Sequence, residues 1–177
     1  MQIRTETKND YKHVFNLNYT AFGNRDDEAK LVERIRFSDG FIPELSIVAD
    51  DQGEIVGHLL LSKAKIINEN GEKEVVVLAP VAVLPEFQKK GIGIKLIEEG
   101  LKRAKDLGYG LVLLIGHPTY YPKFGFQPAR AHGLELTQYQ VPDDVFMVCE
   151  LKDRELENTV GELHYPKAFF GATSQIN

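Results

Sequence analysis

The residues from Leu78 to Gly93 read LAPVAVLPEFQKKGIG and join an apolar run to a segment with helical periodicity. Gly91 and Gly93 stand directly before that helical segment. The start of a helix exposes backbone N–H groups without partners, and the helix dipole adds partial positive charge there. Glycines let a bulky anion approach the main chain. The stretch is therefore a candidate phosphate-binding loop, and the alternative is a plain turn between a strand and a helix.

The segments before this loop alternate between helical and strand patterns. We expect a short strand at Gln2–Thr5, and helices from Asn9 or Asp10 to about Ala21 and from about Asp27 to Arg36. Runs rich in Val, Ile and Leu then follow, separated by short Asp, Asn and Gly turns, which predicts an antiparallel meander. Its strands are Leu45–Ala49, Ile55–Ala64 and Glu74–Val83.

The segments after the loop predict a helix from Ile92 to Leu107 followed by a buried strand, Leu111–Ile115. The apolar stripe of that helix is expected at Ile94, Ile97, Leu101 and Ala104. A strand, a helix and a strand in this order favour a parallel crossover. With a last strand at Val145–Leu151, the sequence predicts one α+β or mixed α/β domain that spans residues 1–177.

Composition excludes several classes of function. The chain of 177 residues is 43% hydrophobic and 27% charged, which is typical of an ordinary globular protein. It has neither a long apolar run nor an apolar N-terminal signal, so we expect a cytoplasmic protein without a membrane partner. The net charge of −5 argues against nucleic acid as a partner. The single cysteine, Cys149, is expected to be buried and inert.

Three known kinds of phosphate-binding loop could explain the stretch that contains Gly91 and Gly93. A P-loop requires Gly-Lys-Ser/Thr after its spacer, which is absent here, and a dinucleotide fingerprint requires a glycine where Leu96 stands. The remaining pattern is Gln/Arg-x-x-Gly-x-Gly/Ala, which Gln88, Gly91 and Gly93 satisfy. This pattern resembles the pyrophosphate loop of the GNAT superfamily of acyl-CoA-dependent N-acyltransferases.

A second motif supports this resemblance. The run YYPKFGF, Tyr120–Phe126, is similar to the aromatic turn that follows the fifth strand in that superfamily. The segments AFG, EAKLVERIR, HPTYYPKFGF and FMVCEL resemble the YhbS-like branch of bacterial acetyltransferases. The resemblance implies a mostly antiparallel, twisted sheet with a splayed parallel strand pair and flanking helices. Pro80 cannot donate to a strand ladder, so it is compatible with a bulged fourth strand that leaves the fifth.

The resemblance also implies a site. Acetyl-CoA would be the cosubstrate, and no metal would be needed. The main chain of Val81, Ala82 and Val83 would pair with the pantetheine arm, and Tyr121 would contact the cofactor and protonate the leaving thiolate, while Tyr120 would only pack. The pyrophosphate would lie against a set of consecutive loop residues: Gln88, Lys89, Lys90, Gly91, Ile92 and Gly93.

The general base has no clear match. Some relatives carry a glutamate on the fourth strand, but valines and Leu78 occupy most of that strand here. His117 and Glu28 are the candidates, whereas His58 is expected to be structural. The leading prediction is an N-acetyltransferase, acting as a monomer or homodimer on an amine of a small molecule or a protein. The second is an acyl-CoA-binding or sensor module without turnover.

Overall fold

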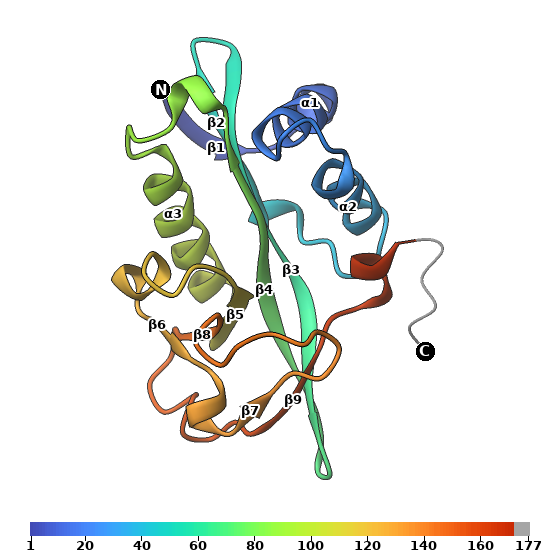
Figure 1. Cartoon of the computed structure of the whole chain (residues 1–177), viewed down its shortest axis with the longest axis vertical. Coiled ribbons are helices and arrows are strands. Elements are labelled where there is room, and N and C mark those ends of the chain that lie inside the picture. The colour runs from blue at the N-terminus through green and yellow to red at the C-terminus, as the bar shows by residue number, and fades with distance from the viewer. Residues whose placement is uncertain (172–177) are drawn as a thin grey trace.

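The structure is a computed structural model, and it describes residues 1–171 (Figure 1). Its helices are α1 (Tyr11–Ala21), α2 (Asp27–Arg36) and α3 (Ile92–Asp106). Its strands are β1 (Gln2–Thr5), β2 (Ser46–Asp51), β3 (Glu54–Asn68), β4 (Gly71–Val83), β5 (Leu111–Ile115), β6 (Phe126–Pro128), β7 (Leu134–Glu135), β8 (Phe146–Glu150) and β9 (Gly161–His164). Both predicted N-terminal helices and the predicted strands are thus confirmed, with shifts of a few residues at some ends.

One sheet connects all of these strands, in the order β1-β2-β3-β4-β5-β8-β6, and β9 pairs with β3 and β7. Strands β2, β3 and β4 form the predicted antiparallel meander. Strands β4 and β5 are parallel and are connected through α3, so the predicted crossover is confirmed as well. Helix α3 covers one face of the sheet, whereas α1 and α2 cover the other (Figure 1). This arrangement confirms the predicted mixed α/β architecture with flanking helices.

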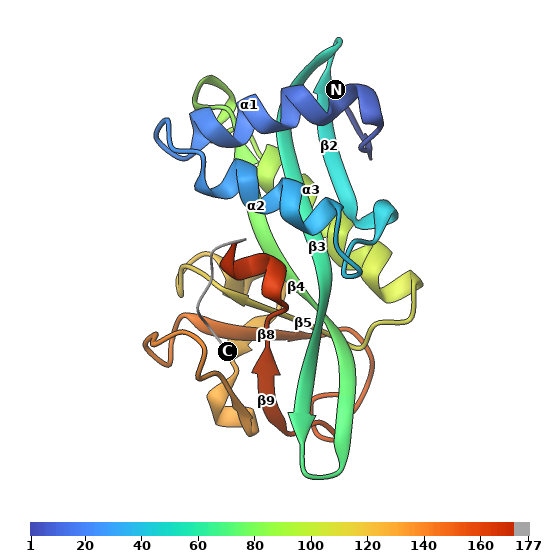
Figure 2. The same cartoon turned by 90° about the vertical axis from the view of Figure 1, so that its right-hand side faces the viewer.

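The helices bury the faces that their apolar periodicity predicts, with one correction. Val14 in α1 and Val32 in α2 are fully covered, and both helices lie side by side in Figure 2. In α3, Ile94 is 36% exposed, so its predicted place in the buried stripe is wrong. Gly100 lies in that stripe instead, and a Cβ there would stand 2.9 Å from a methyl carbon of Leu59. The buried stripe also includes Ile92 and Leu96, so it is turned toward these residues and away from Ile94.

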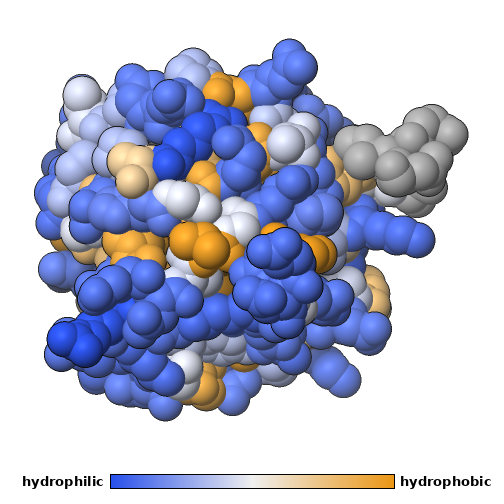
Figure 3. Space-filling view, turned by 90° about the horizontal axis from the view of Figure 1, so that it is seen from below, coloured by the Kyte–Doolittle hydropathy of each residue, from blue (hydrophilic) through white to orange (hydrophobic). Residues whose placement is uncertain are grey.

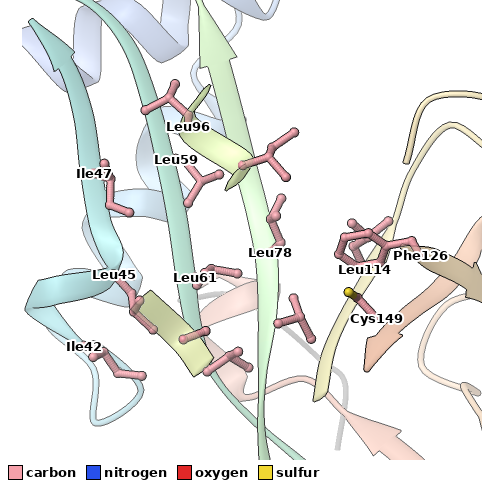
Figure 4. Close-up of a cluster of buried hydrophobic side chains, with 14 of the residues drawn as sticks. Ile42, Leu45, Ile47, Leu59, Leu61, Leu78, Leu96, Leu114, Phe126 and Cys149 are labelled. Atoms are coloured by element: carbon pink, nitrogen blue, oxygen red, sulfur yellow. The ribbon is translucent and has the colours of Figure 1, made fainter. Parts of the chain in front are cut away.

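Strand β4 separates from β5 halfway along its length. The two strands pair only at Val76 and Val77 of β4, opposite β5. Beyond them, the β3–β4 register shifts because Ala79 and Pro80 together oppose a single β3 residue, which is a β-bulge. The predicted loss of pairing at Pro80 is therefore confirmed. Figure 4 shows Leu78 on β4 and the cluster of Leu114, Phe126 and Cys149 on the far side of the divergence.

None of the helices within residues 1–171 has the length and apolar character needed to cross a bilayer. The face seen in Figure 3 is mostly hydrophilic, with apolar side chains in small separate patches. Cys149 is buried, as expected, and burial raises the pKa of its thiol to about 11.

A buried polar network joins α1 and α2 to the sheet. His58 on β3 is fully buried, and its ring nitrogens lie 3.1 Å from Ser46 Oγ and 3.4 Å from Asn18 Nδ2. Ser46 Oγ donates to Glu6, whose other oxygen lies 2.7 Å from Arg36 Nη2. Because Ser46 donates to Glu6, it accepts the Nε2–H of a neutral imidazole. His58 therefore has the predicted structural role.

This network predicts a loss of stability in mild acid. Burial, with a smaller contribution from Arg36, lowers the pKa of His58 to about 3. An unfolded histidine titrates near 6.5, so the unfolded state binds the extra proton first, and stability falls as the pH drops through that window. Below about pH 6, His58 should lower the free energy of unfolding by about 1.4 kcal/mol for each pH unit. Urea unfolding as a function of pH should show this slope, and His58→Gln should lack it; identical slopes would refute the account.

Candidate active site

A cleft of about 540 Å³ brings the two sequence motifs together. One wall comes from the end of β4 and the start of α3, and the opposite wall comes from the aromatic turn after β5. The lining residues are Val81, Val83, Phe87, Gln88, Lys89, Gly91, Ile92, Gly93, Ile94, Tyr120, Tyr121 and Lys123. Another cleft lies at the edge of β3 and is lined by Lys63 and His164 among others, but neither motif contributes to it.

The loop before α3 presents its backbone N–H groups to this cleft. Lys89 and Gly91 have positive φ angles of 64° and 83°, with Lys90 between them in an ordinary conformation. Alternation of this kind turns successive N–H groups to one side and makes a concave anion site. The N–H of Lys95 is the first that bonds within the helix, to Gly91 O at 3.1 Å. The preceding N–H groups at the start of α3 are therefore free to bind an anion.

The end of β4 offers a second set of main-chain groups, which do not bond to β3. The N–H of Leu84 bonds to Val56 O at 2.9 Å, while Val83 stands opposite Gly57. This geometry identifies Val83 and Gly57 as a pair that exchanges no hydrogen bonds across the β3–β4 ladder. The N–H and C=O of Val83 therefore point away from β3, toward the space that β5 has left.

The main-chain N–H and C=O groups of successive residues point to opposite sides of a strand, which corrects the prediction for Ala82. The main chain of Val81 faces the gap like that of Val83, whereas the main chain of Ala82 faces β3. The side chain of Ala82 is only 3% exposed and belongs to the core cluster of Val14 and Leu17 on the opposite face. Of the three residues predicted for the pantetheine arm, the structure therefore brings Val81 and Val83 to the cleft and leaves Ala82 out.

The loop side chains occupy distinct places. Gln88 Nε2 donates to Val83 O at 3.1 Å, so this side chain ties the loop to the free edge of β4. A Cβ on Gly93 would point into the cleft, 3.4 Å from Tyr120 Oη. Lys89 lines the cleft, but Lys90 does not, and its Nζ lies 5.2 Å from the ring centre of Phe87. The prediction for Lys90 concerns its backbone N–H and its charge near the anion, and its side chain lies outside the cleft lining.

Tyr121 is held in a cluster of aromatic rings. Its ring centre lies 5.1 Å from that of Tyr120 and 5.7 Å from that of Phe126, both nearly perpendicular to it. Burial, followed by the effect of Tyr120, raises the pKa of Tyr121 to about 12. The phenol is therefore protonated at neutral pH and can donate a proton. This is the state that the predicted acid requires.

The two predicted bases lie outside the cleft lining. His117 is exposed, and its carbonyl accepts the N–H groups of Tyr120 and Tyr121 at 3.2 and 3.4 Å, so it shapes the aromatic turn. Glu28 is in the first turn of α2 and shares a helix face with Val32 and Ile35. Its Oε1 is buried and has no hydrogen-bond partner among the described residues. Its other oxygen, Oε2, lies 3.8 Å from Arg25 Nη2, so Glu28 is the candidate whose carboxylate keeps one buried oxygen without a partner in the described chain.

Sequence reasoning missed four residues that line the cleft: Phe87, Ile94, Tyr120 and Lys123. Three of them are adjacent to predicted site residues, and Lys123 lies inside the YYPKFGF motif with its Nζ 4.2 Å from the ring centre of Tyr120. Adjacency to the motifs was therefore the available signal. Within residues 1–171, no group of three or more His, Cys, Asp or Glu side chains is placed to hold a metal ion.

Comparison with known proteins agrees with this geometry. A family model described as an acetyltransferase (GNAT) domain matches residues 2–129, which is more than half of the chain. The chain therefore belongs to the GNAT family and is an N-acetyltransferase by class.

Within the family, it is similar to two proteins of Escherichia coli strain K12, both described as uncharacterized N-acetyltransferases. It is 31% identical to YhbS over 96% of this chain and 98% of YhbS, and 34% identical to YjhQ over 77% of this chain and 75% of YjhQ. The crystal structure of E. coli YhbS in complex with CoA matches with a TM-score of 0.87 at 30% identity, over 95% of this chain and 91% of that one. An acetyltransferase from Brucella melitensis in complex with acetyl-CoA matches with a TM-score of 0.76 at 28% identity, over 95% and 97%.

Proposed function

We propose that this protein transfers the acetyl group of acetyl-CoA to a primary amine by direct attack within a ternary complex. The observation that carries the proposal is the single cleft in which three features meet. These are the unpaired N–H groups of the loop before α3, the free edge of β4 and the protonated phenol of Tyr121. The complexes of YhbS with CoA and of the Brucella protein with acetyl-CoA support the choice of cosubstrate.

The residues of the cleft fit acetyl-CoA group by group. The N–H groups from Lys89 to Gly93 suit the pyrophosphate, and the left-handed backbone at Lys89 and Gly91 turns them toward it. The outward N–H and C=O of Val81 and the outward N–H of Val83 suit the amides of pantetheine, which would pair as an added strand, while the C=O of Val83 already accepts from Gln88 Nε2. The thioester would then lie beside Tyr121, where β4 and β5 diverge.

The reaction requires two proton transfers. A lysine-like amine is neutral only about once in a few thousand molecules at neutral pH, equivalent to roughly 4 to 5 kcal/mol, so a base is useful. We propose Glu28, acting directly or through water, because its Oε1 is buried without a partner. The amine nitrogen bonds to the acetyl carbon, the carbon–sulfur bond breaks, and Tyr121 supplies a proton to the departing sulfur. The proton lost by the amine passes to the base, and the Tyr121 phenolate regains a proton from solvent.

Release of the CoA thiol tests this proposal. Acetyl-CoA is incubated with the protein and a panel of amines, namely spermidine, L-lysine, an aminoglycoside and a peptide with a free N-terminus. We expect thiol release above the amine-free background with at least one class of amine, with the acetylated product visible by mass spectrometry. Acetyl-CoA binding by calorimetry without release for any amine would instead favour a binding or sensor module, in keeping with the absence of an acidic residue at Val75–Leu78 of β4.

A further inference from the structure

Gly116, which directly follows β5, lies against the ring of Tyr121. A Cβ at this position would stand 2.5 Å from Cε2 and 2.9 Å from Cδ2 of Tyr121, and 3.1 Å from a methyl carbon of Leu114. Real Cβ atoms do not approach other heavy atoms that closely. The absence of a side chain at Gly116 therefore creates the space that the Tyr121 ring occupies.

Neighbouring contacts oppose a shift of the ring or of the Gly116 backbone that would relieve the clash. On its other sides, Tyr121 packs against Tyr120, Phe124 and Phe126, with ring centres 5.1, 6.4 and 5.7 Å away. The backbone of Gly116 is fixed as well, since its N–H donates to Val145 O at 2.9 Å. A methyl group at Gly116 would thus push the ring out of its slot.

The backbone conformation does not explain why residue 116 is a glycine. Nine glycines of the described chain have positive φ angles, where other residues are strained, but Gly116 is not among them. Alanine is therefore compatible with its backbone, and the contact with the Tyr121 ring is the feature that disfavours a side chain.

We propose that Gly116 is a positioning residue for acetyl transfer: its missing side chain sets where the Tyr121 hydroxyl stands relative to the thioester. The inference rests on the proposed function for its catalytic consequence, but the displacement of the ring follows from packing alone. Gly116 itself would touch neither substrate nor cosubstrate.

The first test observes the ring directly. The protein is labelled with ¹³C-tyrosine, and the Tyr121 ring signals are assigned by their loss in Tyr121→Phe. We expect Gly116→Ala to shift the Tyr121 signals, while those of Tyr165, in a separate aromatic cluster with Tyr139 and Phe169, stay in place and show that the protein is folded. Unchanged Tyr121 signals would overturn the proposal. Gly40→Ala is the control, because a Cβ there comes no closer than 3.4 Å to any atom.

The second test is a double-mutant cycle on thiol release from acetyl-CoA, with hydroxylamine as the acceptor. This small amine is already neutral at neutral pH, so it can attack the thioester without first losing a proton to the base. We expect Gly116→Ala to lower kcat roughly ten- to a hundredfold with little change in the KM for acetyl-CoA. In the Tyr121→Phe background, the same change should alter kcat less than about twofold, because the hydroxyl is already gone.

The outcomes separate the two proposals. If Tyr121→Phe alone leaves kcat unchanged, the acid role in the proposed function fails, whatever Gly116→Ala does. If Tyr121→Phe lowers kcat and the fold-changes in kcat of the two substitutions multiply in the double mutant, the acid role stands. Gly116 then acts through something other than the Tyr121 hydroxyl. That result would refute the positioning role.

Discussion

Gly93→Val is expected to weaken acetyl-CoA binding at least about 100-fold, or roughly 3 kcal/mol. Gly93 is in the first turn of α3 and has no positive φ, so valine is compatible with its backbone. A Cβ at this position would point into the cleft, 3.4 Å from Tyr120 Oη and 3.9 Å from Val83 Cγ2. The valine methyl groups would therefore fill the space between the two walls, where the pyrophosphate must pass.

Calorimetric titration with acetyl-CoA measures this loss, and Lys95→Val provides the matched control. Lys95 is exposed on the same helix and does not line the cleft, so its replacement tests the lower helix propensity of valine together with the loss of one positive charge near the loop. Gly91 is a poorer site for the test, since its φ of 83° would add backbone strain to any steric effect. Equal affinities of Gly93→Val and the wild-type protein would remove the loop from the binding site.

Tyr121→Phe is expected to lower kcat by about 100- to 10,000-fold, the usual range for loss of a general acid. Its Kd for acetyl-CoA should change less than about threefold, because the phenylalanine ring keeps the packing against Tyr120 and Phe126 and loses only the hydroxyl. Tyr120→Phe is the control within the same cluster. If Tyr120→Phe lowers kcat as much as Tyr121→Phe does, the assignment of the proton transfer to Tyr121 is wrong.

The pH dependence of kcat provides an independent check on Tyr121. Burial raises the pKa of this phenol to about 12, so the proton donor is lost only as the pH rises through that value. The wild-type rate should therefore rise with pH as the amine becomes neutral and should show no decline from Tyr121 near its ordinary pKa of about 10.

The sequence was informative where local chemistry determines local structure. Helix α2 has the predicted bounds, Asp27–Arg36, because its apolar spacing at Ala29, Val32 and Ile35 agrees with its charged outer face. The short polar turns predicted the meander, and Gly91 and Gly93 predicted the loop before α3. The same patterns located the candidate site, because the two motifs that line the cleft are each contiguous in the chain.

The features that the sequence did not predict depend on the register between strands and on glycines, which have no side chain. Whether Val81 or Ala82 turns its main chain to the gap follows from the bulge at Pro80 and the β3–β4 register. The contact of Gly116 with Tyr121 leaves no trace in an apolar pattern, and neither does that of Gly100 with Leu59. Glu28 and Tyr121 come from distant parts of the chain, and only the fold determines their surroundings.

The most direct test of the central claim is the crystal structure of the complex with acetyl-CoA. We expect the pyrophosphate against the N–H groups from Lys89 to Gly93, pantetheine paired with Val81 and Val83, and the thioester sulfur within hydrogen-bond distance of Tyr121 Oη. Acetyl-CoA bound outside this cleft, or pantetheine paired through Ala82 instead of its neighbours, would contradict this expectation.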